Sequence, residues 1–201
     1  IGIGYSTMTK VPVAIICTLG PGATNVATAV GQATQDGAAL VVIVGQGSTK
    51  RLERDSHQIM NQIEFFKPIA KRVVSIREPN LVSGIVHKAV KESISGKPGS
   101  VVIELPENIA KLEGEYRYLP RASRNFNRNS YFINDLAISE AVKMINNSKN
   151  PVFVVGAGVA RDDASYHLRK LIHWIYYPHQ MEDKVVNTFQ AKGTVVGSKT
   201  V

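Results

Sequence analysis

Apolar residues in the first part of the chain follow two patterns, one typical of buried strands and one of amphipathic helices. Residues 11–18 ("VPVAIICT") are almost wholly apolar and end at a glycine turn. After the turn, apolar residues recur at a helical spacing, at Ala23, Val26, Ala27 and Val30. Residues 38–45 ("AALVVIVG") show no polar alternation, as in a parallel strand covered on both faces. The pattern predicts two neighbouring parallel strands joined by a crossover helix.

The alternation of strand and helix continues to about residue 106. Residues 70–76 predict a strand, and residues 96–106 predict a turn and a further strand. Between them Pro79 is expected to open a helix with an apolar stripe formed by Leu81, Val82, Ile85, Val86 and Ala89. From residue 107 to 134 the sequence becomes charged, Asn-rich and Pro-containing, a composition that predicts an interdomain connector.

A second series of elements follows the connector. Asn134 or Asp135 is expected to cap a helix whose apolar face consists of Ile138, Ala141, Val142 and Ile145. Residues 151–158 predict a buried strand with a glycine turn, residues 161–175 the next helix, and residues 184–195 another strand and glycine turn. The whole pattern predicts an α/β chain of two open, doubly wound parallel-sheet domains.

Composition narrows the class of protein. The 201 residues exceed the usual size of one domain, and the 44% hydrophobic and 20% charged residues are ordinary for a soluble protein. No apolar run is long enough to span a bilayer. The first ten residues lack a signal-peptide pattern and do not begin with Met, so we expect an internal part of a longer protein. The single Cys17 lies in an apolar run, which predicts a buried, reduced thiol and favours the cytoplasm.

The chain is basic, with 24 Lys and Arg against 16 Asp and Glu, a formal net charge of +8. Part of the excess lies in residues 116–132, where aromatic residues alternate with Arg117, Arg121, Arg124 and Arg128. Because no recognised nucleic-acid-binding fold surrounds these arginines, we interpret the segment as a solvated connector and expect neither a nucleic-acid nor a membrane partner.

The glycine turn at residues 20–25 ("GPGATN") is the first candidate site. It follows a strand, at the sheet edge where α/β proteins bind ligands. Gly20 and Gly22 permit a tight turn, Pro21 fixes one φ angle, and Thr24 or Asn25 is expected to cap the following helix. Such a turn can present its backbone to a flat ligand, or it can merely form the corner between strand and helix.

Polar residues also follow the next strand. Gln46, His57 and Gln58 are expected to face the same cleft as the glycine turn, and the alternative is an ordinary polar surface loop. The "VVGAGVAR" stretch lacks the third glycine of a dinucleotide fingerprint. Histidines recur at an interval that does not align them on one helical face, so we assign no metal site to His167, His173 and His179.

In order and spacing these stretches resemble the thiamine diphosphate-dependent enzymes of the acetolactate synthase type. The resemblance covers "GYSTMTKVPVAIICTLGPGATNVATAVGQATQDGAALVVIVGQ", "RLERDSHQIMNQIEFFKPIAKRVVSI" and "SGKPGSVVIELPENI". "PVFVVGAGVARDDA" and "VVNTFQAKGTV" resemble the middle domain, whereas residues 173–184 depart from the family. The resemblance implies the end of a pyrimidine-binding domain at residues 1–110, a connector at 111–134 and an incomplete central domain at 135–201.

The resemblance also implies a reaction, in which two pyruvates condense to 2-acetolactate and carbon dioxide. Thiamine diphosphate and Mg²⁺ would be the cofactors, and the pathway would be branched-chain amino acid or acetoin biosynthesis in the cytoplasm. Carried over by position, the cofactor-binding residues are Gly20, Pro21, Gly22, Asn25 and Gln46. The residues facing the substrate are His57 and Gln58.

Parts of the family's site have no counterpart in this sequence. The catalytic glutamate would precede Ile1, and the G-D-G motif that holds Mg²⁺ and diphosphate would follow Val201. We therefore expect this chain alone to be inactive and the complete enzyme to be a homodimer or homotetramer, since the family's cofactor lies between subunits. "SHQ" at residues 56–58 favours the catabolic, FAD-free type. Two alternatives stay open: another thiamine diphosphate enzyme, such as a pyruvate oxidase or a decarboxylase, or a non-catalytic α/β binding module.

Overall fold

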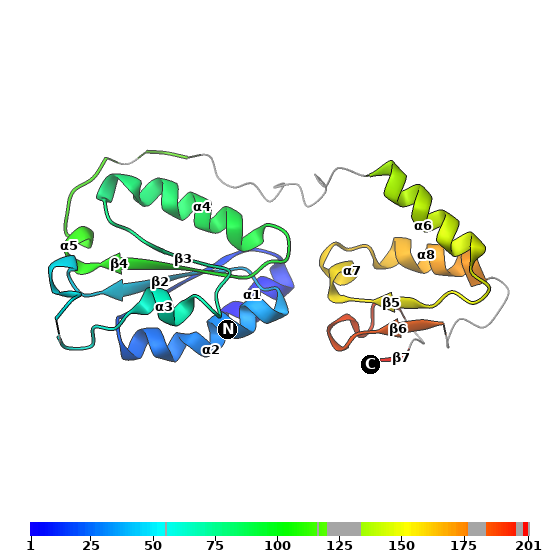
Figure 1. The fold of residues 1–201 in the computed structure, drawn as a ribbon, viewed down its shortest axis with the longest axis horizontal. Helices are drawn as coiled ribbons and strands as arrows, with labels where there is room; N and C mark the ends of the chain where they lie inside the picture. Colours follow the sequence, from blue (N-terminus) through cyan, green and yellow to red (C-terminus); the bar gives the residue numbers. More distant parts are fainter. Residues whose placement is uncertain (55, 116, 120–133, 177–183, 196–198, 201) are drawn as a thin grey trace. The chain divides into compact units, whose positions relative to one another are not determined.

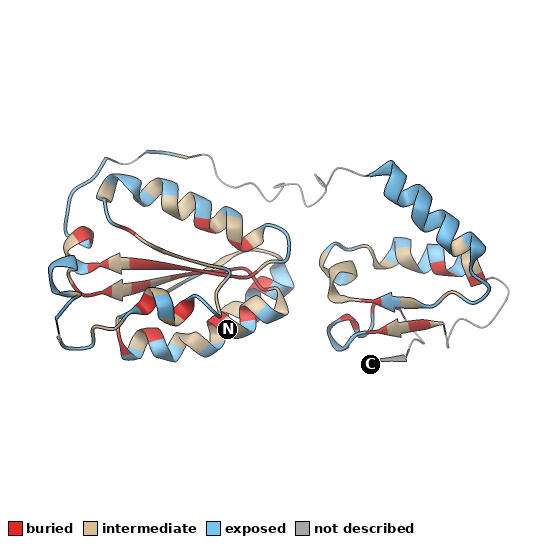
Figure 2. Cartoon of the chain, viewed as in Figure 1, coloured by how far each residue is buried: buried red, intermediate tan, exposed pale blue. Residues whose placement is uncertain are grey.

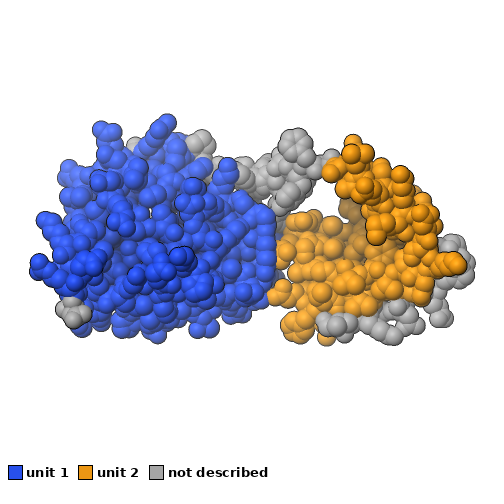
Figure 3. Space-filling model, in the orientation of Figure 1, with its two compact units in different colours: residues 1–127 blue, residues 128–201 orange. Residues whose placement is uncertain are grey.

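The computed structural model describes residues 1–54, 56–115, 117–119, 134–176, 184–195 and 199–200. The chain divides into two compact units, Ile1–Asn127 and Arg128–Val201 (Figure 3). The division falls within residues 111–134, while the assignment of the units to pyrimidine-binding and central domains stays a prediction. Arg117 is exposed. The other three arginines of the basic segment, and His179, lie outside the described residues.

Unit 1 is an α/β sandwich whose elements follow one another as the periodicity predicts. Its helices are α1 (Gly2–Thr9), α2 (Pro21–Asp36), α3 (Gln62–Phe66), α4 (Val82–Ile94) and α5 (Glu107–Ala110). Its strands are β1 (Val13–Cys17), β2 (Leu40–Gln46), β3 (Arg72–Ser75) and β4 (Ser100–Pro106). Two short 3₁₀ turns, η1 (Thr49–Arg51) and η2 (Pro79–Leu81), lie in the connections.

The sheet of unit 1 is parallel throughout, with the strand order β1-β2-β4-β3. β1 and β2 are neighbours joined by α2, so the predicted crossover unit is confirmed. β2 and β4 occupy the centre, where helices cover both faces (Figure 1). This position explains why their sequences are continuous apolar runs.

Two hydrophobic cores lie on opposite faces of this sheet. Leu40, Val42 and Val44 of β2 point toward α2 and pack with the buried residues Ala23, Val30, Ala33, Phe66 and Val102. Val41 of β2 points the other way, toward α4, into a cluster with Ile76, Ala89, Val101, Ile103 and Ile109. Alternation of side chains along one strand therefore supplies both cores.

Two expectations for unit 1 are wrong in detail. Pro79 opens η2 rather than a helix, and α4 begins only at Val82. Leu81 ends η2 and Val82 begins α4, and both are exposed, at 52% and 37%, so the predicted apolar stripe packs on the sheet only from Ile85 onward. Cys17 is half-buried rather than buried, since it lies on the edge strand β1.

Unit 2 contains α6 (Asp135–Asn147), α7 (Ala157–Arg161), α8 (Ser165–Tyr176) and the 3₁₀ turn η3 (Phe189–Ala191). Its parallel sheet has the order β5 (Phe153–Val155), β6 (Val185–Asn187), β7 (Lys199–Thr200). Ile172 and Tyr176 of α8 pack on Val155 and Val185 to form its core. With both units built this way, the predicted α/β class is confirmed.

The start of α6 is as predicted, but other parts of unit 2 differ. Asn134 caps α6 by accepting hydrogen bonds from the backbone N–H groups of Leu136 and Ala137, at 3.1 and 3.2 Å. The predicted glycine turn instead begins the short helix α7, and α8 starts only at Ser165. β5 is not fully buried, since Val154 is 74% exposed. Figure 2 shows α6 exposed along nearly its whole length.

Within the residues that the structure describes, no helix has the length and apolar character that crossing a membrane would require.

The two-sided core of unit 1 leads to a stability prediction. Leu40→Ala should lower the free energy of unfolding by about 2–5 kcal/mol, because it leaves a cavity beneath α2. Leu112→Ala is the matched control, since Leu112 is 56% exposed and should lose less than about 0.5 kcal/mol. Urea denaturation followed by circular dichroism measures both variants, and equal losses would contradict this account of the core.

Candidate functional site

The GPG turn connects β1 to α2 at the carboxyl edge of the unit 1 sheet. Gly20 lies just before the helix with φ 56° and ψ −113°, and Pro21 occupies the first helical position. A positive φ suits glycine, while the fixed φ of proline suits the start of a helix. The residue types of the turn are thus explained by its backbone.

The predicted side-chain cap of α2 is wrong. Thr24 is already in the second half of the first turn, and its hydroxyl donates to the carbonyl oxygen of Pro21 at 3.1 Å. Asn25 lies one residue further in, and no side chain caps the helix. A side-chain cap is less needed here because Pro21, at the first position of α2, has no backbone N–H group that requires a hydrogen-bond acceptor.

The loop after β2 returns to the turn, as expected. A Cβ placed on Gly20 would lie 2.8 Å from both the Cβ and the carbonyl oxygen of Gln58. Gln58 itself has φ 60°, a conformation uncommon for residues other than glycine. The structure therefore brings Gly20 and Gln58 into contact, at a point where both backbones are left-handed.

Gln46 does not face a cleft, contrary to expectation. It is 3% exposed, and its Nε2 donates to the carbonyl oxygen of Met60 and to Oε2 of Glu104, each at 2.9 Å. Its Oε1 accepts from the N–H of Gly47 at 2.9 Å. The reason is the side-chain alternation of β2, which puts Gln46 on the same face as Val44, beneath the returning loop.

Gln62, at the start of α3, also joins the end of this loop to β2. This residue is fully buried, and its Nε2 donates to the carbonyl oxygen of Gly45 at 2.9 Å. Its Oε1 has no hydrogen-bond partner among the described residues. Ile59 packs close to Gly47, where a Cβ would lie 2.5 Å from its Cδ1. The loop is therefore fastened to the end of β2 by the residues that follow Gln58.

Sequence reasoning missed Glu104 and Gln62. Both are buried polar residues, and Glu104 interrupts the apolar run of the central strand β4. An acidic residue inside such a strand is a recognisable signal, because burying a carboxyl group without partners is costly. Glu104 could therefore have been predicted to take part in a buried hydrogen-bond network, which here includes Gln46 and Met60.

The remaining predicted residues are accessible. Pro21 and Asn25 are exposed and four residues apart, so they share one face of α2, while His57 and Gln58 are exposed on the loop. The side chains of Asn25 and Gln58 form no hydrogen bond to any described residue. Their amides can donate to and accept from a ligand but cannot transfer protons. This arrangement can bind and orient a polar molecule.

Charged residues fasten the beginning of the loop to α5. Arg51 lies 2.8 Å from the Glu107 carboxylate and Lys111 lies 2.6 Å from it. Thr49 and Asn108 also exchange two hydrogen bonds, at 2.9 and 3.0 Å. The Lys111 hydrogen bond, followed by the charges of Lys111 and Arg51, lowers the pKa of Glu107. These groups are exposed, so salt should weaken the contact.

Two further groups bear on the chemistry. Burial raises the pKa of the Cys17 thiol, which therefore stays protonated and is a poor nucleophile. In the described part of the chain, no three His, Cys, Asp or Glu side chains gather as a metal site.

Comparison with known proteins adds to this geometry. Residues 1–65 match the family described as thiamine pyrophosphate enzyme, N-terminal TPP binding domain. The first part of the chain is therefore similar to the N-terminal domain of thiamine pyrophosphate enzymes. The matched residues contain every predicted site residue, from Gly20 to Gln58.

Its relatives are similar over most of the chain. It is 30% identical to the acetolactate synthase large subunit of Corynebacterium glutamicum over 191 residues, which cover 95% of this chain and 30% of the relative. It is 30% identical over 196 residues to a probable acetolactate synthase large subunit of Methanococcus aeolicus, covering 96% and 32%. A glyoxylate carboligase of Escherichia coli O157:H7 is 30% identical over 177 residues, covering 83% and 28%. The chain therefore spans about a third of the length of the relatives it matches.

The contact between the turn and the loop predicts the effect of a methyl group at residue 20. Gly20→Ala should destabilise the protein by roughly 1–3 kcal/mol, because the methyl group meets Gln58 and the backbone has a positive φ. Gly84→Ala, inside α4 with nothing within 4 Å of the added Cβ, should stabilise it by up to about 1 kcal/mol. Urea denaturation compares the two, and a Gly20→Ala variant as stable as the original protein would show that the turn tolerates a side chain.

The buried network predicts how firmly the loop is held. Gln46→Ala should raise amide hydrogen exchange in residues 47–61 by about tenfold, since the bonds to Met60 and Glu104 are lost. Gln35→Ala, an exposed substitution on α2, is the control and should leave the loop unchanged. Exchange measured by mass spectrometry tests this, and unchanged protection in Gln46→Ala would show that the network does not hold the loop.

Proposed function

We propose that this chain supplies the pyrimidine side of a thiamine diphosphate site in an acetolactate synthase, which condenses two pyruvates to 2-acetolactate and carbon dioxide. One observation carries the proposal: the GPG turn is packed against Gln58, within the residues that match the thiamine pyrophosphate binding domain. Similarity to acetolactate synthase large subunits over most of the chain supports the choice of reaction.

The residues of the turn fit a flat, polar ring. Exposed Pro21 offers a rigid apolar surface, and the Asn25 amide, on the same helix face, offers a donor and an acceptor. Thiamine diphosphate, when bound, supplies the electron sink for the loss of carbon dioxide from a 2-oxo acid. In this proposal Pro21 and Asn25 hold the pyrimidine, and Gly20 and Gly22 contribute to the site by letting the turn pack against Gln58 and Thr18.

His57 and Gln58 have a different role in the proposal. Both are exposed beside the turn, and the Gln58 amide has no hydrogen bond to another described residue. It is therefore free to orient the polar end of pyruvate, with His57 beside it. Gln46, which is buried, acts by positioning the loop that carries them rather than by touching the cofactor.

The finer assignments belong to the same proposal. The enzyme would be a cytoplasmic homodimer or homotetramer without FAD, and Mg²⁺ would accompany the diphosphate. No described residue of this chain is assigned to the metal. The chain alone would not turn over pyruvate.

A second candidate differs in the 2-oxo acid. The relative named glyoxylate carboligase is as similar in sequence as the acetolactate synthases, although it covers less of this chain. Glyoxylate has a hydrogen in place of the pyruvate methyl group, so a smaller pocket beside Gln58 would favour it. Substrate competition between the two acids distinguishes the candidates.

Product analysis tests the reaction. The natural protein, supplied with pyruvate, thiamine diphosphate and Mg²⁺, should form acetolactate, detected as acetoin after acid treatment. Oxygen consumption and a flavin spectrum should be absent. Acetyl phosphate with peroxide would indicate an oxidase, acetaldehyde a decarboxylase, and turnover of glyoxylate alone a carboligase.

Gln58 is the residue to substitute in that assay. Gln58→Ala should lower kcat/KM for pyruvate by up to about a hundredfold, because an orienting hydrogen bond is lost. Gln35→Ala, exposed on α2 and remote from the loop in sequence, serves as the control. If Gln58→Ala keeps its circular dichroism spectrum and shows unchanged turnover and pyruvate affinity, Gln58 has no part in the site.

A further inference from the structure

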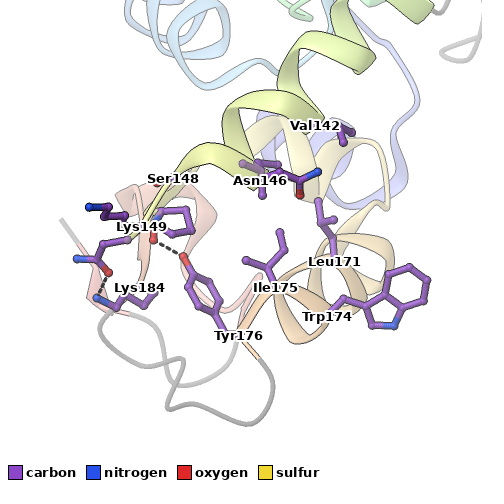
Figure 4. Close-up of a pocket in the computed structure, with 12 residues that line it drawn as sticks. Val142, Asn146, Ser148, Lys149, Leu171, Trp174, Ile175, Tyr176 and Lys184 are labelled. Carbon is purple, nitrogen blue, oxygen red and sulfur yellow. Dashed lines mark hydrogen bonds between the residues drawn. The ribbon is translucent and has the colours of Figure 1, made fainter.

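A groove of about 780 Å³ lies between α6 and α8 of unit 2 (Figure 4). Its apolar walls are Val142 and Ile145 from α6, and Leu171, Trp174 and Ile175 from α8. This volume is comparable to that of sites that bind one small molecule, although the groove is open on one side. None of these residues belongs to the site proposed in unit 1.

The two ends of the groove differ in chemistry. Figure 4 shows Lys149 and Lys184 at one end, with Leu171 and Trp174 at the other. The Lys184 ammonium donates to the side-chain oxygen of Asn150, which fixes its position and leaves two of its three N–H donors for a ligand. The described residues that line the groove include no Asp or Glu. The groove is therefore largely apolar, with the Asn146 amide in its α6 wall, and cationic at one end.

The basic end lies at the amino edge of the unit 2 sheet. Lys149 precedes β5 by four residues, and Lys184 comes directly before β6. Nucleotides and similar ligands of open parallel sheets bind at the opposite, carboxyl edge, where the Gly156–Gly158 segment begins α7. The groove is thus separate from the place where a cofactor of this fold would be expected.

The apolar wall is open to solvent. Trp174 is 84% exposed, Val142 49% and Leu171 43%. Covering such side chains with an apolar molecule is favourable, since it removes hydrocarbon surface from water. The two lysines at one end of the groove then favour a molecule that carries a negative charge at one end.

We propose that this groove binds an amphipathic carboxylate with a single apolar chain. The chain lies between α6 and α8 beside Trp174, and the carboxylate is held by Lys149 and Lys184. Tyr176, whose hydroxyl donates to the carbonyl oxygen of Pro151, closes the floor.

Trp174 is the only tryptophan of the chain and reports on the groove directly. Titration of the 201-residue chain with decanoate below its micellar concentration should give a saturable blue shift of tryptophan emission. Lys149→Ala should weaken decanoate binding about tenfold, the effect of one charge-assisted contact. Lys143→Ala, on the same helix but outside the groove, should bind like the original chain.

Two further measurements separate the proposal from its rivals. Decanol, which has no charge, should bind equally to the original chain and to Lys149→Ala, whereas Leu171→Gln should weaken both ligands. A shift without saturation, or equal binding of decanoate by Lys149→Ala and Lys143→Ala, would overturn the proposal. So would emission that depends on protein concentration and not on decanoate, because a second copy would then cover the groove.

One result would assign the lysine another role. α6 ends at Asn147, next to Lys149, and a cation near a helix C-terminus is stabilising without any ligand. If Lys149→Ala lowers the melting temperature but leaves decanoate binding unchanged, Lys149 serves the helix end and the proposal is wrong. No thiamine diphosphate or 2-oxo acid enters these assays, so their outcome is independent of the function proposed for unit 1.

Discussion

The hydrogen bond between Gln46 and Glu104 joins the two central strands of unit 1 at their carboxyl ends, and the candidate site depends on it. The same Gln46 amide also donates to Met60, so one buried side chain determines where the returning loop lies. Glu104 is 4% exposed and takes part in no salt bridge with a described residue. Burying a carboxyl group with so few partners costs stability, and proteins tend to bear such costs at functional sites.

The two units bury their sheets to different degrees. In unit 1 the central strand β2 contributes side chains to cores on both faces, so the sheet is a rigid base for its loops. In unit 2, α8 covers the side of β5 that carries Val155, while Val154 on the other side is 74% exposed. Rigid support is thus strongest beneath the GPG turn and weakest around α6, where most side chains face solvent.

Much of the fold follows from local sequence, and most of the site does not. The apolar runs of β2 and β4 and the cap at Asn134 depend on near neighbours in the chain, so they could be predicted. Gln46 was expected beside the cofactor because it ends a strand, but the face that a strand's last residue occupies depends on register and on what covers it. The contact of Gly20 with Gln58 spans 38 residues of sequence and depends on tertiary packing, so no local pattern could reveal its distance. Likewise, the apolar spacing of α6 predicted an apolar face, but whether a neighbour covers that face depends on tertiary packing, and Ile138 and Val142 are 52% and 49% exposed.

The close approach of Gly20 and Gln58 has a consequence for how this protein can vary. A Cβ at residue 20 would lie 2.8 Å from the backbone carbonyl oxygen of residue 58 as well as from its Cβ, so a substitution at residue 58 would not make room for a side chain at residue 20. A glycine at residue 58 would remove the Cβ and relieve the strain of its left-handed backbone, but it would also remove the exposed amide. Evolution or design that alters the substrate through residue 58 must therefore keep glycine in the turn, which makes the turn a fixed element beside a variable one.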